Sequence, residues 1–91
     1  MADAIRNNQA KQRFELEAEG HLAGAYYELS ENTITFTHTE VPKALEGKGV
    51  GSRLVKGALD QVRNGSLKVI AQCPFVKAYI GKHAEYADLL K

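Results

Sequence analysis

Hydrophobic and polar residues alternate along the first half of the chain, and this alternation predicts β-strands. In residues 13–19 an apolar side chain occupies every second position between charged ones. A period of two is typical of a strand with one face on the core and the other in water. Residues 22–30 are rich in apolar and aromatic side chains, and residues 33–39 alternate threonines with other residues. Short turns separate these segments, so we expect three antiparallel strands.

The second half of the chain changes to helical spacing. In residues 50–63 apolar side chains recur three and four positions apart, which predicts an amphipathic helix. Gly65 follows the last turn, where a left-handed cap residue is expected. Residues 68–73 then have the pattern of a short strand. Because a strand after a crossover helix lies parallel to the strand before it, we expect residues 68–73 to extend the sheet in parallel.

A second helix is expected near the end of the chain. Pro74 suits a first helical turn, and residues 75–82 continue with helical spacing. We expect the buried stripe of this helix to consist of Phe75, Val76, Tyr79, Ile80 and His83. Residues 84–91 add a further helical turn or two. The predicted fold class is α/β (α+β), with an antiparallel-to-mixed sheet of about four strands flanked by helices, in the order β-β-β-α-β-α.

Length and composition favour one globular domain. The 91 residues are 44% hydrophobic and 25% charged. We expect residues 1–11 to be a flexible polar lead-in without the apolar core of a signal peptide, and residues 12–91 to form the domain. No hydrophobic run approaches the roughly 20 residues that a membrane-spanning helix needs.

Charge and cysteine content narrow the partners and the compartment. A formal net charge of +1 argues against a protein that coats nucleic acid or an anionic membrane. Cys73 is the single cysteine, so the chain has no internal disulfide, and a reducing cytoplasmic location is expected. We expect a monomer or weak dimer with no nucleic-acid or membrane partner.

Three glycines at alternate positions, Gly47, Gly49 and Gly51, precede the first predicted helix. Glycine lets backbone amides approach a ligand without a Cβ in the way. Because the loop leads into a helix, the amides and partial positive charge of the helix N-terminus favour a phosphate-sized anion at this point. The spacing GxGxG fits neither the Walker pattern GxxxxGK[ST] nor the Rossmann pattern GxGxxG. The alternative is an ordinary strand-to-helix turn that binds nothing.

At this loop the chain resembles a known family. Residues 41–55 resemble the coenzyme-A-binding motif, [QR]xxGx[GA], of the GNAT N-acetyltransferase superfamily. Residues 38–42, 71–75 and 79–86 resemble more closely the small GNAT-like proteins that consist of little more than the catalytic core. Glu46 stands where Arg or Gln is usual, which leaves phosphate binding to the backbone amides. Within these 91 residues we expect no counterpart of the N-terminal helices and late strands that shape the acceptor site of larger members.

The resemblance covers roughly residues 14–90 and implies acetyl-CoA as co-substrate. It implies that the strand ending near Thr39 and Val41 pairs its backbone with the pantetheine arm. The pyrophosphate would be held by amides of Gly47, Lys48, Gly49, Val50, Gly51 and Ser52. The thioester would lie where this strand and the strand ending at Cys73 splay apart. The implied reaction moves an acetyl group to a primary amine of a small molecule or of a protein lysine or N-terminus.

Cys73 and His38 are the first two catalytic candidates. Cys73 is either a small core residue or, beside the helix that starts at Pro74, a stabilised thiolate that accepts the acetyl group, with His38 as its partner. His38 is expected to share a strand face with Ile34 and Phe36. It is either a partly buried histidine or the general base that deprotonates the amine.

Glu40 and Tyr79 complete the catalytic candidates. Glu40 competes for the role of base, and the alternative is a solvated turn carboxylate. The resemblance implies that Tyr79 protonates the leaving thiolate, and the alternative is a core tyrosine. The spacings of the histidines and Cys73 match no familiar zinc ligand set, so no metal site is expected.

Two other function classes stay open at this point. One is a non-catalytic CoA- or acyl-CoA-binding module whose missing acceptor walls come from a partner protein. The other is a small interaction domain whose glycine turn binds no ligand. Binding of CoA separates these classes, because only the last one predicts none.

Overall fold

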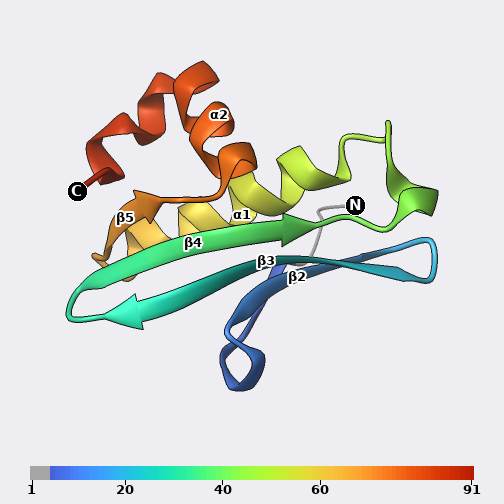
Figure 1. Ribbon diagram of the computed structural model, residues 1–91, viewed down its shortest axis with the longest axis horizontal. Helices are drawn as coiled ribbons and strands as arrows, with labels where there is room; N and C mark the ends of the chain where they lie inside the picture. Colours follow the sequence, from blue (N-terminus) through green and yellow to red (C-terminus); the bar gives the residue numbers. More distant parts are fainter. Residues whose placement is uncertain (1–4) are drawn as a thin grey trace.

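Five strands form one sheet in the order in which they occur along the chain (Figure 1). In this computed structural model, which describes residues 5–91, the strands are Ile5–Asn8 (β1), Arg13–Ala18 (β2), His21–Ser30 (β3), Thr33–Glu40 (β4) and Lys68–Ala71 (β5). The first four strands are antiparallel neighbours, and β5 lies parallel to β4. The predicted mixed sheet is therefore confirmed, including the parallel strand after the helix.

Strand β1 differs from the expected flexible lead-in over residues 1–11. Residues 5–8 pair with β2, from Ile5 opposite Leu16 to Asn8 opposite Arg13. The Ile5 side chain packs where Gly57 has none, and a Cβ at Gly57 would collide with it. Ladder hydrogen bonds and the apolar Ile5 side chain hold β1 in place. The strand is too short to show a periodic hydrophobic pattern, so the sequence did not predict it. Residues 1–4 of the expected lead-in lie outside the described residues.

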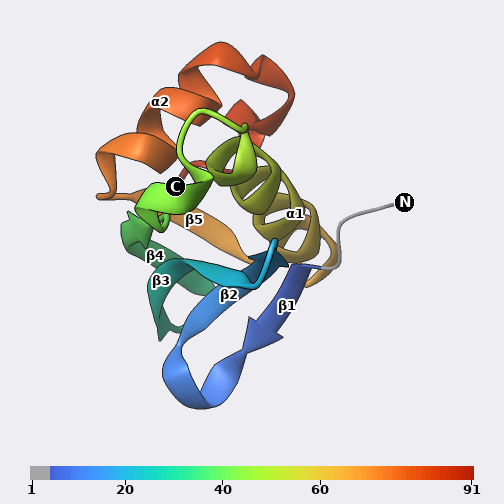
Figure 2. The ribbon, with the colours of Figure 1, turned by 90° about the vertical axis from the view of Figure 1, so that its right-hand side faces the viewer.

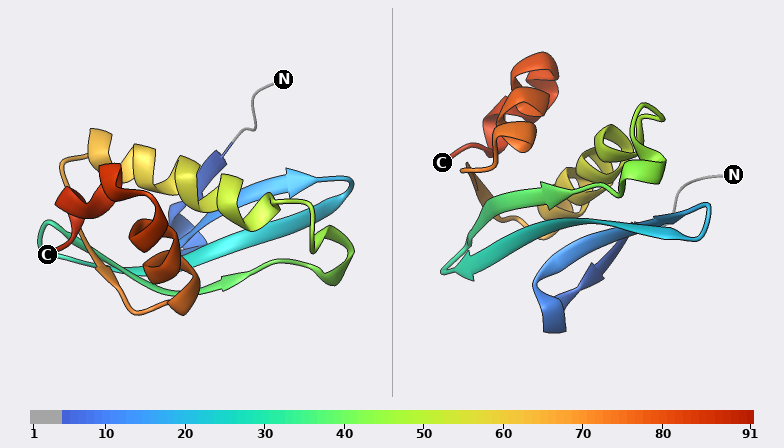
Figure 3. Two further views of the ribbon diagram at one scale, coloured as in Figure 1. Left: turned by 90° about the horizontal axis from the view of Figure 1, so that it is seen from above. Right: turned by 45° about the vertical axis from the view of Figure 1, so that its right-hand side comes forward.

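Both helices cover the same face of the sheet, and no helix of residues 5–91 covers the other face, here called the open face (Figure 2). The helices are Val50–Asn64 (α1) and Pro74–Lys82 (α2), and a 3₁₀ segment, Ala84–Leu89, follows α2. Seen from above, α1 runs along the strands (Figure 3). The apolar stripe predicted for the first helix is buried throughout. No helix within residues 5–91 is long and apolar enough to cross a membrane.

The buried stripe predicted for α2 is only partly correct. Val76, Tyr79 and Ile80 are buried, as expected. Phe75 is 41% exposed, because its ring lies over Gly51 at the surface and not in the core. His83 is half-buried at the end of α2, where its ring stacks on Tyr79.

A β-bulge in β4 reverses the side-chain alternation near its end. Tyr27 pairs with Phe36 and Tyr26 with His38, so Thr37 is an extra residue without a partner of its own. Because an extra residue shifts the period of two by one position, the side chains beyond it point to the opposite faces. The prediction that His38 shares a face with Phe36 is therefore wrong. His38 lies on the open face, where it stacks on Tyr26.

The prediction that one face of β2 is exposed to solvent also needs a correction. Glu17 is exposed there, as the alternation predicts, but Glu15 is only 2% exposed. Arg6 and Arg13 bind and cover its carboxylate. Arg6 reaches Glu15 from the neighbouring strand β1 and Arg13 from β2 itself, and the alternation alone does not show that these side chains bury the acid.

Candidate functional site

β4 and β5 separate after a short stretch of parallel pairing. Their register runs from Thr33 opposite Lys68 to Phe36 opposite Ala71. The amides of Gln72 and Cys73 both donate to the Phe36 carbonyl, at 3.1 and 2.9 Å, and the chain then turns into α2. The expected strand over 68–73 thus ends two residues early, whereas β4 continues to Glu40. Within the described part of the chain, no strand pairs with residues 37–40 on the β5 side.

The glycine loop connects β4 to α1 and has the backbone that glycine permits. Gly47 and Gly49 have φ angles of +80° and +73°, a left-handed region in which a Cβ is strained. Gly49 caps α1, and no side chain within the described residues caps the first amides of this helix. The first amides of an α-helix have no partner within the helix, so they are available to an anion.

A cavity of about 230 Å³ lies beside this loop. It is lined by Val41, Leu45, Glu46, Gly47, Gly49, Val50, Gly51, Ser52 and Phe75. Six of the eight residues predicted to bind the cofactor are therefore brought together around one cavity. Sequence reasoning missed Phe75, whose position in the first turn of α2 was the available signal. A helical side chain covers the surface on the N-terminal side of its own Cα, here the start of α1.

Gly51 is required by the packing of this cavity wall. A Cβ at Gly51 would lie 2.7 Å from Cζ of Phe75 and 3.2 Å from its Cε2. The Phe75 ring therefore rests directly on the α1 backbone. Phe75 and Leu45 add apolar side chains to the lining of the cavity.

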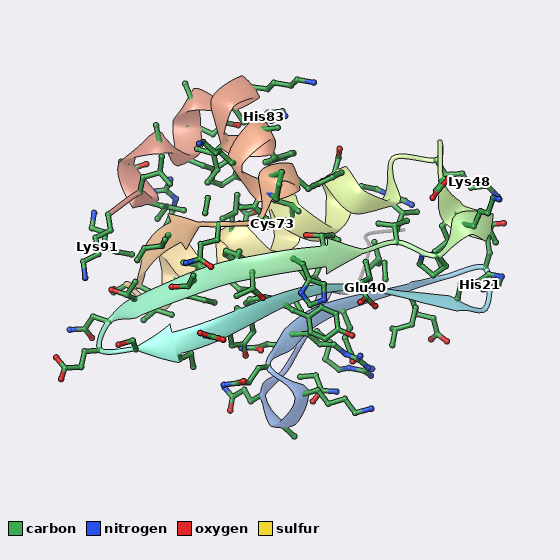
Figure 4. The ribbon with its side chains drawn as sticks, in the orientation of Figure 1. His21, Glu40, Lys48, Cys73, His83 and Lys91 are labelled. Atoms are coloured by element: carbon green, nitrogen blue, oxygen red, sulfur yellow. The ribbon has the colours of Figure 1, made fainter. Side chains whose placement is uncertain are left out.

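Thr39 and Lys48, the other two predicted cofactor residues, do not line the cavity. The Lys48 ammonium donates to both carboxylate oxygens of Glu19, at 2.7 and 2.9 Å. Glu19 lies in the turn between β2 and β3, so this turn is tied to the glycine loop (Figure 4). The hydrogen bond from Lys48 lowers the pKa of the Glu19 carboxyl.

Cys73 lies on the helix side of the sheet, where β4 and β5 separate (Figure 4). Its thiol is buried, and Sγ is 3.3 Å from Oγ1 of Thr39. The structure thus pairs Cys73 with Thr39 and not with His38. The bulge at Thr37 explains the difference, because it turns Thr39 toward the helices and His38 away from them.

His38 and Glu40 lie together on the open face. Nε2 of His38 is 3.2 Å from Oε2 of Glu40, and the two side chains are 53% and 64% exposed. The imidazole stacks on the Tyr26 ring, with centroids 4.3 Å apart and planes inclined by 8°. The two predicted base candidates therefore form one pair that an acceptor can reach from solvent.

Tyr79 lies within the helical layer. Its ring contacts are with His83 and Tyr86, at centroid distances of 4.1 and 6.1 Å. Burial raises the pKa of Tyr79, so the phenol stays protonated at neutral pH. The Tyr86 hydroxyl donates to Oδ1 of Asp60 at 2.6 Å, and burial raises its pKa as well. Within residues 5–91, no three His, Cys, Asp or Glu side chains are grouped to hold a metal ion.

The chain is similar to known proteins in sequence and in fold. The family model described as GCN5-related N-acetyl-transferase matches residues 13–89. Protein NATD1 of Xenopus tropicalis is 29% identical over 79 residues, which cover 84% of this chain and 72% of that protein. Human NATD1 has the same identity, with 70% of its length covered. The solution structure of a GCN5-like protein from Staphylococcus aureus has a TM-score of 0.73 and 32% identity, over 97% of this chain and 87% of that one.

Proposed function

The chain belongs to the GCN5-related N-acetyltransferase family, and we propose that it transfers an acetyl group from acetyl-CoA to a primary amine. The observation that carries the proposal is the cavity of about 230 Å³ at the glycine loop, close to the point where β4 leaves β5. The two candidate general bases, His38 and Glu40, contact each other on the other face of the same strand. Cofactor and acceptor would thus approach β4 from opposite faces.

The residues around the cavity fit the phosphates and pantetheine arm of CoA. Left-handed backbone at Gly47 and Gly49 turns the loop, and the first amides of α1 supply hydrogen-bond donors. The backbone of β4 from Thr39 to Val41 would bind the pantetheine arm. Glu46 also lines the cavity, but it is exposed, so its carboxylate is free to turn toward solvent and away from a phosphate.

Direct transfer is the route that the geometry favours. His38 or Glu40 accepts a proton from the amine, and the amine nitrogen then attacks the thioester carbonyl carbon. The carbon–sulfur bond breaks, and the CoA thiolate leaves and takes up a proton. Amide donors beside the splayed part of β4 would stabilise the developing oxyanion. Tyr79 remains the candidate acid from the family resemblance, although its ring contacts lie within the helical layer.

Covalent transfer through Cys73 is the second route. In it, the thiolate attacks the thioester, CoA leaves, and the amine then takes the acetyl group from the sulfur. His38 lies on the open face of the sheet and does not contact the thiol. The hydroxyl of Thr39 is the polar group beside the thiol instead. Incubation with acetyl-CoA alone, followed by mass spectrometry, decides between the routes. The direct route predicts no acetyl group on Cys73, and stoichiometric acetylation that an amine discharges would contradict it.

An acceptor screen tests the function itself. Polyamines, amino acids and lysine peptides are offered with acetyl-CoA, and release of free CoA thiol is measured. We expect transfer to at least one amine, and a decrease of about 100-fold or more when both His38→Ala and Glu40→Gln are present. Glu28→Gln is the matched control, because it changes an exposed side chain on the neighbouring strand β3, and it should leave the rate unchanged. Equal rates in the double variant and the control would show that neither His38 nor Glu40 acts as the general base.

A non-catalytic CoA-binding module is the alternative function. The observation in its favour is the uncovered open face, on which a partner protein would complete the acceptor site. Binding of CoA without turnover of any amine supports this alternative. Sedimentation and cell fractionation test the accompanying predictions of a monomer or weak dimer and of a cytoplasmic location.

A further inference from the structure

Glu15 is a buried carboxylate that the proposed reaction does not use. Its two oxygens accept hydrogen bonds from Arg6 Nε at 3.1 Å, Arg6 Nη2 at 2.6 Å, Asn8 Nδ2 at 3.0 Å and Arg13 Nε at 2.5 Å. The hydrogen bonds from Arg6, opposed by burial and joined by those of Arg13 and Asn8, lower the pKa of Glu15 to about 2. A paired buried charge is weak evidence for a purely stabilising role, because desolvation offsets much of its attraction.

Arg13 connects this carboxylate to an aromatic ring on the next strand. While Nε binds Glu15, Nη1 donates to the Tyr26 hydroxyl at 2.7 Å. The guanidinium carbon is also 5.5 Å from the centroid of the Tyr26 ring, a cation–π distance. Gly24 leaves room for this arrangement, because a Cβ there would already touch Arg13 Cδ and Tyr26 Cε1 at 3.4 Å.

The Tyr26 ring in turn supports His38. The register places Arg13, Tyr26 and His38 directly opposite one another across β2, β3 and β4. Thr37 Oγ1 donates to the Tyr26 carbonyl at 3.4 Å, which fastens the bulge that brings His38 to this face. An exposed histidine normally samples several rotamers, whereas here a parallel ring at 4.3 Å favours one of them.

We propose that Glu15, Arg13 and Tyr26 are positioning residues that fix the His38 ring beside Glu40. Glu15 orients Arg13, Arg13 orients Tyr26, and Tyr26 holds the imidazole so that Nε2 faces the Glu40 carboxylate. The catalytic consequence rests on the proposed function, but the positioning of the ring does not. A displacement of about 1 Å in a reacting group can cost about 100-fold in rate, so a fixed ring matters for the proton transfer.

Histidine ring spectra test this positioning directly. The chain has three histidines, so His21 and His83 serve as internal controls in ¹⁵N-histidine-labelled protein. In Tyr26→Leu we expect the ring signals of His38 to shift and its side chain to become more mobile. The signals of His21 and His83 should stay in place. Tyr26→Phe keeps the ring but loses the hydroxyl that Arg13 binds, so we expect a smaller change.

Kinetics supply the second readout. We expect kcat for acetyl transfer to fall by about 10- to 100-fold in Tyr26→Leu, with KM for acetyl-CoA and the Kd of CoA unchanged. A merely structural role would instead lower stability without this selective loss of kcat. Glu28→Gln on the same strand is the control, and unchanged CoA binding shows that the variant is folded.

The outcomes separate this inference from the proposed function. Identical His38 ring signals in wild type and Tyr26→Leu would overturn the positioning. Shifted signals with an unchanged kcat would overturn its catalytic role. If His38→Ala itself leaves transfer unchanged, the proposed base is at fault, and the ring spectra still decide whether Tyr26 positions the imidazole.

Discussion

Replacement of Gly51 by alanine tests the geometry of the cofactor cavity. The added methyl would lie 2.7 Å from Cζ of Phe75, whereas ordinary contacts of a Cβ begin at 3.4 Å. The α1 backbone is held by its helix, so the ring has to move by more than half an ångström. Because Gly51 and Phe75 both line the cavity of about 230 Å³, this movement changes the shape of the binding site.

The effect on stability should be small. Overpacking costs about 1–3 kcal/mol of folding free energy. Because Phe75 is 41% exposed, its ring can turn aside, and the cost should lie at the low end of this range. Alanine within a helix recovers about 0.5–1 kcal/mol relative to glycine. We expect the free energy of unfolding to fall by about 1 kcal/mol or less, and Tm to fall by no more than about 4–8 °C. The affinity for CoA should fall further, by about tenfold or more, which corresponds to about 1.4 kcal/mol.

Calorimetric titration of CoA measures this effect in a double-mutant cycle. Gly51→Ala is compared in the wild-type and Phe75→Ala backgrounds, and its penalty should disappear when the ring is absent. Gly81→Ala in α2 is the matched control, because a Cβ added there would meet no atom within 4 Å, and affinity should be unchanged. Wild-type affinity in Gly51→Ala, or the same penalty in both backgrounds, would show that the contact between Gly51 and Phe75 does not shape the CoA site.

Three further predictions concern charge and hydrogen bonding. The folded-state pKa of Glu15, about 2, lies below its ordinary value of 4.5, so its ionised form stabilises the fold above pH 4.5 and this contribution is lost as the pH falls toward 2. Urea unfolding across this window should show less acid sensitivity in Glu15→Gln, and equal sensitivity would contradict the assignment. Glu19→Gln releases Lys48 toward the phosphates, so CoA should bind about two- to fivefold more tightly at low salt and equally at high salt. Weaker binding at low salt would show that Lys48 gains no contact with CoA when the Glu19 charge is removed. Tyr86→Phe removes the 2.6 Å hydrogen bond to Asp60 and should lower the free energy of unfolding by about 1–2 kcal/mol without changing CoA affinity. No loss in urea titration would show that this bond contributes nothing net.

The helical stripe and the glycine loop could be predicted because each follows from local chemistry. The stripe of α1 needs only the helical period, and all its predicted members are buried. Gly47 and Gly49 adopt the left-handed backbone for which glycine is suited. The family resemblance added the cofactor, which the glycine spacing alone left open between a phosphate site and an ordinary turn.

The features that sequence analysis missed depend on tertiary contacts. One extra residue, Thr37, reverses the facing of His38, and a pattern of period two gives no sign of a bulge. The burial of Glu15 depends on Arg13 of its own strand and on Arg6, which comes into contact with it only when β1 pairs with β2. Phe75 has the spacing of a core residue, but its ring lies on Gly51 of another helix.

Titration of ¹⁵N-labelled protein with CoA is the sharpest test of the proposed cofactor site, because it reports binding at the glycine loop without depending on the acceptor. We expect saturable shifts of the amide signals of Gly47, Gly49, Gly51 and Ser52. The amides of Gly65 and Gly81, which do not line the cavity, should stay in place. Unchanged loop signals at millimolar CoA would contradict the proposed site.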